Sequence, residues 1–224
     1  MFVALETATD TGSVALGTGT ALAGEVVIGV RTRHAESLLP ALEFLLERSR
    51  VSRRDITAVV VGAGPGSFTG VRVAAATARG LAHGLGVPLF AYSSLAALAD
   101  ETAADRPVCA LFDARRGEVY AACYERPTGS NVLQEIMAPA VLGVADLRDR
   151  MRDIQPFYAG EGAVRYAAEL GIAPPQLTVP RASALLRLAA EDLASGAEAG
   201  RVAAISGWEP SYLRTSGAER GIRG

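Results

Sequence analysis

The chain of 224 residues contains no lysine, and all 22 of its basic residues are arginine. It has 24 acidic residues, a formal net charge of −2 and no long block of one sign. Proteins that coat nucleic acid or bind anionic membranes through charge carry a basic stretch or a large positive excess. The sequence therefore argues against strong autonomous nucleic-acid binding and against membrane binding. Codon bias explains the missing lysine better than a phosphate-binding function does.

Cysteines are few, and long apolar runs and a basic leader are missing. Cys109 and Cys123 both lie in apolar, strand-like runs, which predicts two buried thiols rather than a disulfide framework. Charged residues interrupt every apolar run before it reaches the length of a membrane span. The first ten residues include Glu6 and no basic side chain, so we expect no signal peptide. The sequence predicts a soluble, cytoplasmic protein.

Histidine is rare, and the common nucleotide-binding motifs are missing. His34 and His83 are too few for a zinc cluster and a poor supply for a catalytic triad. The glycine-rich loop at residues 62–70 resembles a phosphate-binding loop, but Val71 follows Gly70 where a Walker A loop has lysine. The glycine spacing also fails the dinucleotide fingerprint, and no G-x-S-x-G elbow occurs. We therefore predict no catalytic residue, no metal ligand and no bound cofactor.

Hydrophobic patterning predicts an α/β fold that occurs twice along the chain. In the first half we expect strands at residues 1–5, 13–19, 21–30, 56–64 and 87–91 and helices at 35–50, 71–85 and 93–103. In the second half we expect strands at 107–114, 117–125, 131–137 and 156–160 and helices at 144–153, 163–170 and 180–195. The join near residues 103–107 predicts two domains, 1–104 and 105–224.

The strand, loop and helix at residues 56–85 leave two interpretations of Arg72 open. Backbone N–H groups at such a loop can bind an anion. A cation in the first helical turn opposes the helix dipole, so Arg72 could be compensated by a phosphate, a carboxylate or a partner's acidic side chain. Alternatively, Arg72 is solvated and the glycines only permit a tight turn.

The helix at residues 71–85 is apolar or small almost all the way round. At 100° per residue, one face is wide enough to dock on a sheet, and it consists of Val71, Ala74, Ala78, Leu81, Ala82 and Leu85. The opposite face is uncharged and consists of Val73, Ala76, Thr77, Gly80 and Gly84. A glycine inside a helix costs about 1 kcal/mol relative to alanine. This cost is easier to tolerate where a second backbone approaches closely.

The helix at residues 35–50 has a second stripe of its own, Ser37, Ala41, Phe44 and Arg48, in which Phe44 has no obvious place in the core. Two neighbouring helices with spare faces predict a helix-to-helix interface with another chain. The alternative is that the second half of the same chain covers both faces. The interface that we predict consists of Ser37, Ala41, Phe44, Arg72, Val73, Ala76, Thr77 and Gly80.

The sequence resembles the TsaB family, also called YeaZ, over nearly its whole length. The most specific matches are "GPGSFTGVRVAAATARGLA" and the following "VPLFAYSSLAAL". The segments "FVALETATDTGSVAL", "RHAESLLPALEFLL", "FDARRGEVYAACYE" and "EPSYLR" also match the family pattern in order. The resemblance implies two ribonuclease-H-like subdomains in tandem, as in actin and sugar kinases.

The resemblance also implies a role in forming N6-threonylcarbamoyladenosine in tRNAs that read codons beginning with A. Members of the family are regarded as non-catalytic partners of the transferase TsaD, joined by the ATPase TsaE. The implied partners are a TsaD-like subunit, a TsaE-like ATPase and, for the isolated chain, a second copy, with tRNA bound only through the complex. The alternative is an ATP-dependent phosphotransferase or glycoprotein peptidase of the same superfamily.

The same resemblance implies which chemistry has been lost. TsaD-type relatives carry a metal-binding His-x-x-x-His pair where this chain has Ser94 and Leu98, and leucine cannot bind a metal. Family members usually have Asp at the end of the first strand, whereas this chain has Glu6. Asp113 mirrors that position in the second half, and we expect its own turn to satisfy it, with Arg115 or Arg116 as its ion-pair partner.

Overall fold

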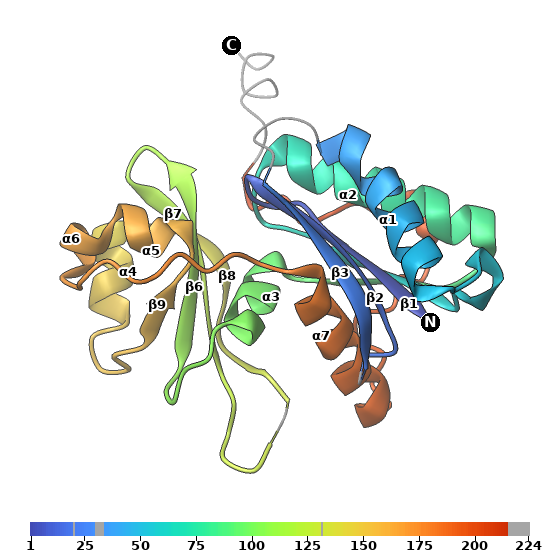
Figure 1. Cartoon of the computed structure of the whole chain (residues 1–224). Helices are drawn as coiled ribbons and strands as arrows, with labels where there is room; N and C mark the ends of the chain where they lie inside the picture. Colours follow the sequence, from blue (N-terminus) through green and yellow to red (C-terminus); the bar gives the residue numbers. More distant parts are fainter. Residues whose placement is uncertain (20, 30–33, 131, 215–224) are drawn as a thin grey trace.

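The computed structural model describes residues 1–19, 21–29, 34–130 and 132–214, and Figure 1 shows two β-sheets with helices between and outside them. The first sheet has the strand order β3-β2-β1-β4-β5 and the second has the order β8-β7-β6-β9. Each sheet combines an antiparallel meander of three strands with parallel pairing beside it, by two strands in the first sheet and by one in the second. This arrangement confirms the duplicated α/β fold and is the one expected of two ribonuclease-H-like subdomains.

The first sheet contains the five strands predicted in the first half of the chain. It consists of β1 (Phe2–Glu6), β2 (Thr11–Gly17), β3 (Leu22–Gly29), β4 (Ala58–Gly62) and β5 (Leu89–Tyr92). Every residue of β4 is buried, as expected of a parallel strand covered on both faces. Because side chains alternate along a strand, Val3 and Leu5 enter one core cluster and Ala4 enters another.

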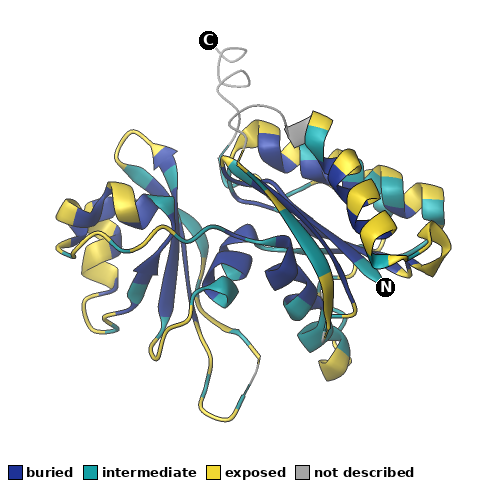
Figure 2. Cartoon of the chain, viewed as in Figure 1, coloured by how far each residue is buried: buried dark blue, intermediate teal, exposed yellow. Residues whose placement is uncertain are grey.

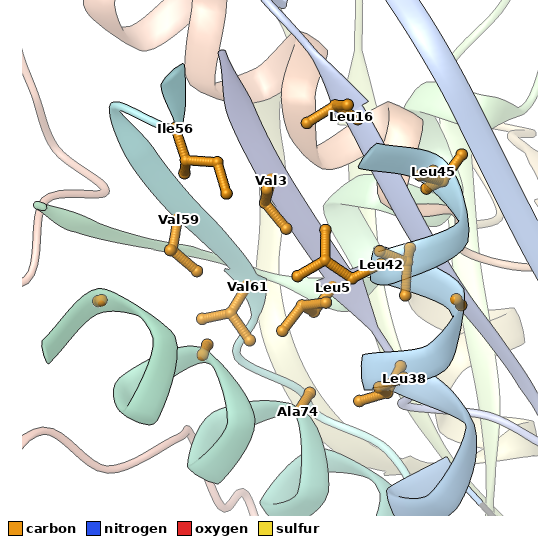
Figure 3. Close-up of a cluster of buried hydrophobic side chains, with 14 of the residues drawn as sticks. Val3, Leu5, Leu16, Leu38, Leu42, Leu45, Ile56, Val59, Val61 and Ala74 are labelled. Carbon is orange, nitrogen blue, oxygen red and sulfur yellow. The ribbon is translucent and has the colours of Figure 1, made fainter. Parts of the chain in front are cut away.

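Two long helices cover the outer face of this sheet. They are α1 (His34–Ser49) and α2 (Phe68–Leu85), with the short 3-10 helix η1 (Arg53–Asp55) between them. Leu38, Leu42 and Leu45 recur at helical spacing on α1, and Figure 3 shows them facing the strand residues Val3 and Leu5. A fully buried leucine contributes about 1.5–3 kcal/mol. This cluster therefore fixes α1 and α2 against the sheet.

The other face of the first sheet carries α7 (Ala182–Ser195), which comes from the far end of the sequence. Leu185 and Leu186 pack there against small strand residues such as Ala4 and Ala15. The segment after α7, which includes the 3-10 helix η2 (Ile205–Gly207), continues along β5 through a bridge at residue 201. Helix α7, which lies within the predicted domain 105–224, therefore packs on the sheet of the first subdomain. The leucines on the apolar face of α7 fit against the small alanine side chains of this sheet, although the helix and the sheet are distant in sequence.

The second subdomain is smaller. Its sheet consists of β6 (Val108–Arg115), β7 (Glu118–Glu125), β8 (Gln134–Gly143) and β9 (Phe157–Ala159), and its helices are α4 (Val144–Arg150), α5 (Glu161–Arg165) and α6 (Ala167–Leu170). Strand β8 extends well beyond the predicted 131–137. The helix predicted at 163–170 is interrupted at Tyr166, whose φ of −108° and ψ of 24° are not helical. Tyr166 is instead buried in the cluster between these helices and the sheet.

The short helix α3 (Ser94–Glu101) lies between the two sheets, and Figure 2 shows that it is mostly buried. Leu95 and Leu98 pack against Phe112 and Tyr124 of the second sheet. Within the described residues, no helix has both the length and the apolar composition that crossing a bilayer requires. Cys109 and Cys123 face each other across β6 and β7 and are buried free thiols, as predicted.

Candidate functional site

A cleft of about 570 Å³ separates the two subdomains. One wall contains Asp10 from the β1–β2 turn and Phe68 from the start of α2, and the other contains Asp113, Glu161 and Arg165. Burial raises the pKa of the Glu161 carboxyl, and the carboxylates of Asp10 and Asp113 also raise it. The cleft is therefore polar and contains both signs of charge.

Asp113 is largely satisfied within its own subdomain. Its carboxylate accepts hydrogen bonds from the Arg115 backbone N–H and the Tyr166 hydroxyl, both at 2.9 Å. The guanidinium groups of Arg165 and Arg115 lie 3.2 Å and 3.5 Å from its Oδ2 atom. The predicted pairing with Arg115 is confirmed. Helix α5 supplies Arg165 as a second partner, which was not predicted. A side chain with this many partners has little capacity to hold a further cation.

Glu6, at the end of β1, is completely buried and does not line the cleft. Its Oε1 atom accepts a hydrogen bond from the Ala8 N–H at 2.7 Å. Within the described residues, Oε2 has no hydrogen-bond partner of normal geometry, although it lies beside the Ser94 hydroxyl. Burial raises the pKa of Glu6 to about 7. Hydrogen bonds to the carboxyl lower its pKa, and the one from Ala8 lowers it most, but burial has the larger effect. A Cβ atom at Gly62 would collide with this carboxyl, so glycine there leaves room for the longer acid.

The glycine-rich loop packs against its own chain. The Ser67 N–H donates to the Ala8 carbonyl at 2.7 Å, and the Gly64 N–H donates to the Ser94 hydroxyl at 3.3 Å. A Cβ atom at Gly70 would collide with the Thr7 carbonyl. Of the two interpretations, the structure favours the one in which the glycines permit a tight turn. The loop fixes the start of α2 against the β1–β2 turn.

Ser94 and Leu98 are both completely buried. The Ser94 hydroxyl accepts the hydrogen bond from Gly64, and Leu98 packs in the apolar cluster between α3 and the second sheet. Among the residues that the structure describes, no group of three or more His, Cys, Asp or Glu side chains is placed to bind a metal ion. These two positions thus contribute packing and one hydrogen bond.

Arg72 has a partner that neither interpretation of the sequence included. Its guanidinium lies 3.8 Å from the centre of the Phe68 ring and 5.5 Å from that of Tyr212. Its Nε–H donates to the Tyr212 hydroxyl at 3.1 Å. Such stacking holds the planar guanidinium in a fixed orientation. Arg72 is exposed on α2, so its stacked side chain forms part of the protein surface.

The outward face of α2 is open, as its composition suggests. Ala76 and Gly80 are exposed, Val73 and Thr77 are half-buried, and a Cβ atom at Gly80 would meet nothing within 4 Å. On α1, Phe44 is 54% exposed. Figure 1 shows α1 and α2 side by side on the outside of the sheet, away from the second subdomain. We call the surface formed by Val73, Ala76, Thr77, Gly80 and Phe44 the open α1–α2 face. Arg72, with Tyr212 stacked on it, lies next to Ala76 at the edge of this face.

The structure changes one residue of the predicted interface. Ala41 is 7% exposed and belongs to the core cluster, because it adjoins the leucine stripe of α1 and the neighbouring elements cover its small side chain. Ser37 is half-buried. The remaining residues stay a prediction as an interface. Phe68 and Tyr212 lie beside Arg72 and were not predicted as neighbours of it. The spacing of four residues between Phe68 and Arg72 was the only local signal that could have indicated their contact.

Comparisons with known proteins agree with the resemblance seen in the sequence. Residues 29–198 match the family model described as TsaD, tRNA N6-adenosine threonylcarbamoyltransferase. The chain is 32% identical to the tRNA threonylcarbamoyladenosine biosynthesis protein TsaB of Escherichia coli, over 99% of this chain and 98% of that protein. It is 31% identical to TsaB of Haemophilus influenzae over 84% of each chain.

A solved structure gives the same result in three dimensions. YeaZ from Pseudomonas aeruginosa superposes with a TM-score of 0.82 at 32% sequence identity, covering 95% of this chain and 99% of that one. The sequence identity and the solved structure agree on one family. The chain belongs to the TsaB family, whose members are also called YeaZ.

Proposed function

We propose that this chain is a non-catalytic subunit in the formation of N6-threonylcarbamoyladenosine in tRNA, specifically in tRNAs that read codons beginning with A. Membership of the TsaB family supports the pathway. The observation that carries the role of a subunit is the open α1–α2 face. Gly80 and Ala76 are exposed there beside a 54% exposed Phe44, whereas a helix face covered only by water usually carries charge.

The partner that we propose for this face is a TsaD-like catalytic subunit. Its helices would approach α2 closely at Gly80 and would bury Phe44. An isolated chain would use the same face to pair with a second copy, because Ala76 and Gly80 permit close approach of a helix and the exposed Phe44 would be buried. A TsaE-like ATPase would join the pair. The tRNA would be bound through the complex, in agreement with the net charge of −2 on this chain.

Three features of the interior support the non-catalytic assignment. Leu98 fills one position of the metal-binding pair found in TsaD-type relatives, and Ser94 fills the other as a buried hydrogen-bond acceptor. Glu6 is completely buried and does not line the cleft. Asp113 already has two arginines and a tyrosine hydroxyl as partners.

The alternative is an enzyme of the same superfamily, either an ATP-dependent phosphotransferase or a glycoprotein peptidase. The observation that favours it is the cleft of about 570 Å³, with Asp10 and Glu161 on opposite walls. The cleft lies where a substrate could enter between two subdomains. Three of its charged groups, Asp113, Arg115 and Arg165, are paired with one another, so we give this alternative second place.

The test is reconstitution. We expect the purified chain to bind a TsaD-like protein from the same organism. We also expect modified tRNA, measured by mass spectrometry of its nucleosides, to form only when both proteins, a TsaE-like ATPase and the threonylcarbamoyl donor are present. The chain alone should show neither ATPase nor peptidase turnover. Equal product without the chain, or turnover that co-purifies with it, would contradict the proposal.

A further inference from the structure

The segment after α7 returns along the first subdomain and is held there by its backbone. Its Gly200 carbonyl accepts a hydrogen bond from the Ala91 N–H at 2.8 Å, and its Val202 N–H donates to the Leu89 carbonyl at 2.9 Å. Further on, Arg79 of α2 donates to the Ser206 carbonyl at 2.7 Å. The segment therefore follows the edge of the first sheet and then crosses to the side of α2.

Residues 211–214, which we call the strap, then reach the glycine-rich loop. The Ser211 N–H donates to the Ala63 carbonyl at 2.9 Å. The Tyr212 ring lies 5.6 Å from the Phe68 ring, and its hydroxyl accepts the hydrogen bond from Arg72. Phe68 belongs to the wall of the cleft that the first subdomain supplies. One end of the strap is therefore attached to that wall.

The other end of the strap is attached to the opposite wall. The guanidinium of Arg214 donates to the carbonyl of Ala114, which lines the cleft, and forms an ion pair with the carboxylate of Glu118. Arg214 is only 26% exposed. Because two extended residues span about 7 Å, Tyr212 and Arg214 can hold these attachment points only if the two walls stay close.

The part of the second subdomain that Arg214 contacts has an unfavourable backbone. Ala114 and Glu118 flank the turn between β6 and β7, in which Arg115, Arg116 and Gly117 have φ values of 68°, 59° and 75°. Non-glycine residues rarely adopt this left-handed region. Contacts from outside the hairpin therefore contribute to holding the turn in this form, and Arg214 supplies contacts on both of its strands.

We propose that the strap fastens the β6–β7 hairpin to the start of α2 and so limits the opening of the cleft. The proposal does not depend on the tRNA-related function. It also connects two parts of the molecule, since Tyr212 contacts Arg72 at the open α1–α2 face while Arg214 contacts the second subdomain. A chain bound to that face would therefore act directly on a residue of the strap.

Hydrogen exchange measured by mass spectrometry tests the proposal on the full chain. We expect Arg214→Ala and Tyr212→Ala each to speed exchange in residues 114–119 about three- to tenfold, because each variant releases one end of the same strap. The double variant should exchange little faster than either single variant. Glu118→Gln should also speed exchange in residues 114–119, because it removes the ion pair with Arg214. Arg201→Ala is the matched control, since its ion pair with Glu198 lies within the same C-terminal segment.

A second measurement separates the strap from a purely local role. Dyes attached to cysteines introduced at Glu47 and Ala168, which are exposed on α1 and α6, report the separation of the subdomains at single-molecule dilution. Native Cys109 and Cys123 are buried and stay unlabelled. We expect a broader distance distribution in Arg214→Ala than in Arg201→Ala. Faster exchange confined to the strap, equal acceleration in β1, or an unchanged distance distribution would each overturn the proposal.

Discussion

At the scale of single residues, Glu6 is the feature with the clearest physical consequence. It is a completely buried carboxyl whose Oε2 atom has no partner of normal geometry within the described residues. Removing an ionised carboxylate from water is strongly unfavourable. Burial accordingly raises the pKa of Glu6 to about 7 from a usual value of 4.5. The folded protein therefore binds this proton more tightly than the unfolded chain does.

We predict a stability difference between Glu6→Gln and the natural chain that grows with pH. The stability that Glu6 contributes is present below about pH 4.5 and is lost as pH rises towards about 7, the pKa of the folded state. A shift of this size corresponds to roughly 3 kcal/mol. Gln is neutral throughout, so urea unfolding should show the variant gaining relative to the natural chain between pH 5 and pH 8.

Glu209→Gln, which changes an exposed carboxyl group, is the control for this measurement. A constant difference between Glu6→Gln and the natural chain across that pH range would show that Glu6 is not protonated in the fold. Ser94→Ala should lower the stability of either form, because the Gly64 N–H loses its acceptor.

At the scale of elements, α2 shows how one helix can have two differently used apolar faces. Val71, Ala74 and Ala78 are buried against the sheet. Gly80 lies on the other face, where a Cβ atom would meet nothing. Ser67 caps the N-terminus of the helix and Gly86 ends it in a left-handed conformation. The ends and the inner face are thus determined within the chain, whereas no described residue packs against the outer face at Gly80.

We predict opposite effects of Gly80→Leu on stability and on pairing. Leucine has a better helical propensity than glycine, so the unfolding free energy should rise by about 0.5–1 kcal/mol. Binding to a TsaD-like protein, or to a second copy, should weaken by about 1–3 kcal/mol, because bulk at a close helix contact overpacks it. Light scattering and thermal unfolding measure the two effects.

Gly70→Ala is the matched control on the same helix. Its Cβ atom would collide with the Thr7 backbone, so this variant should lose stability by about 2 kcal/mol or more. A loss of stability in Gly80→Leu with unchanged pairing would refute the interface on this face.

At the scale of the whole molecule, the two subdomains share their interior. Helix α3 packs against the second sheet and against α7, which itself lies on the first sheet. Asp100, with its side chain 1% exposed, forms ion pairs with Arg187 of α7 and with Arg126, which follows β7. Arg126 also contacts Glu191 of α7 at 3.0 Å. These contacts join the subdomains on the side of α3 and α7.

We predict that both subdomains unfold in one transition. Trp208, the single tryptophan, packs against the core of the first subdomain, and Cys109 and Cys123 lie in the core of the second. Tryptophan fluorescence and thiol reactivity should therefore give the same urea midpoint. Asp100→Ala should lower both midpoints together, because it leaves two arginines without their buried partner. The free energy of unfolding should fall by about 2–4 kcal/mol.

Arg53→Ala serves as the control, since both partners of the Arg53–Glu43 pair are mostly exposed. It should change stability by less than about 1 kcal/mol. Two separate midpoints would show that each subdomain unfolds by itself.

Local sequence patterns predicted most of the elements. Helix α1 was predicted from its leucine spacing and β4 from its unbroken apolar run. The β1–β3 meander was predicted from its short connections. The pairing of Asp113 with Arg115 was predictable because the two residues share one turn. The burial of Ala41 was not predicted, because it adjoins the core stripe, where the packing of neighbouring elements decides burial. The break at Tyr166 was missed because its apolar ring is buried whether or not the helix continues.

The sequence by itself determined the type and order of the elements, the duplicated fold, the family and the two apolar faces of α2. These depend on backbone propensity, on residue periodicity and on motifs read along the chain. Only the tertiary structure decided that α7 covers the first sheet, that Tyr212 stacks on Arg72 from 140 residues away and that Arg214 reaches the second subdomain. The physical reason is that such contacts depend on the shapes and charges of surfaces that meet only after folding. Local sequence patterns do not show which distant residues will meet.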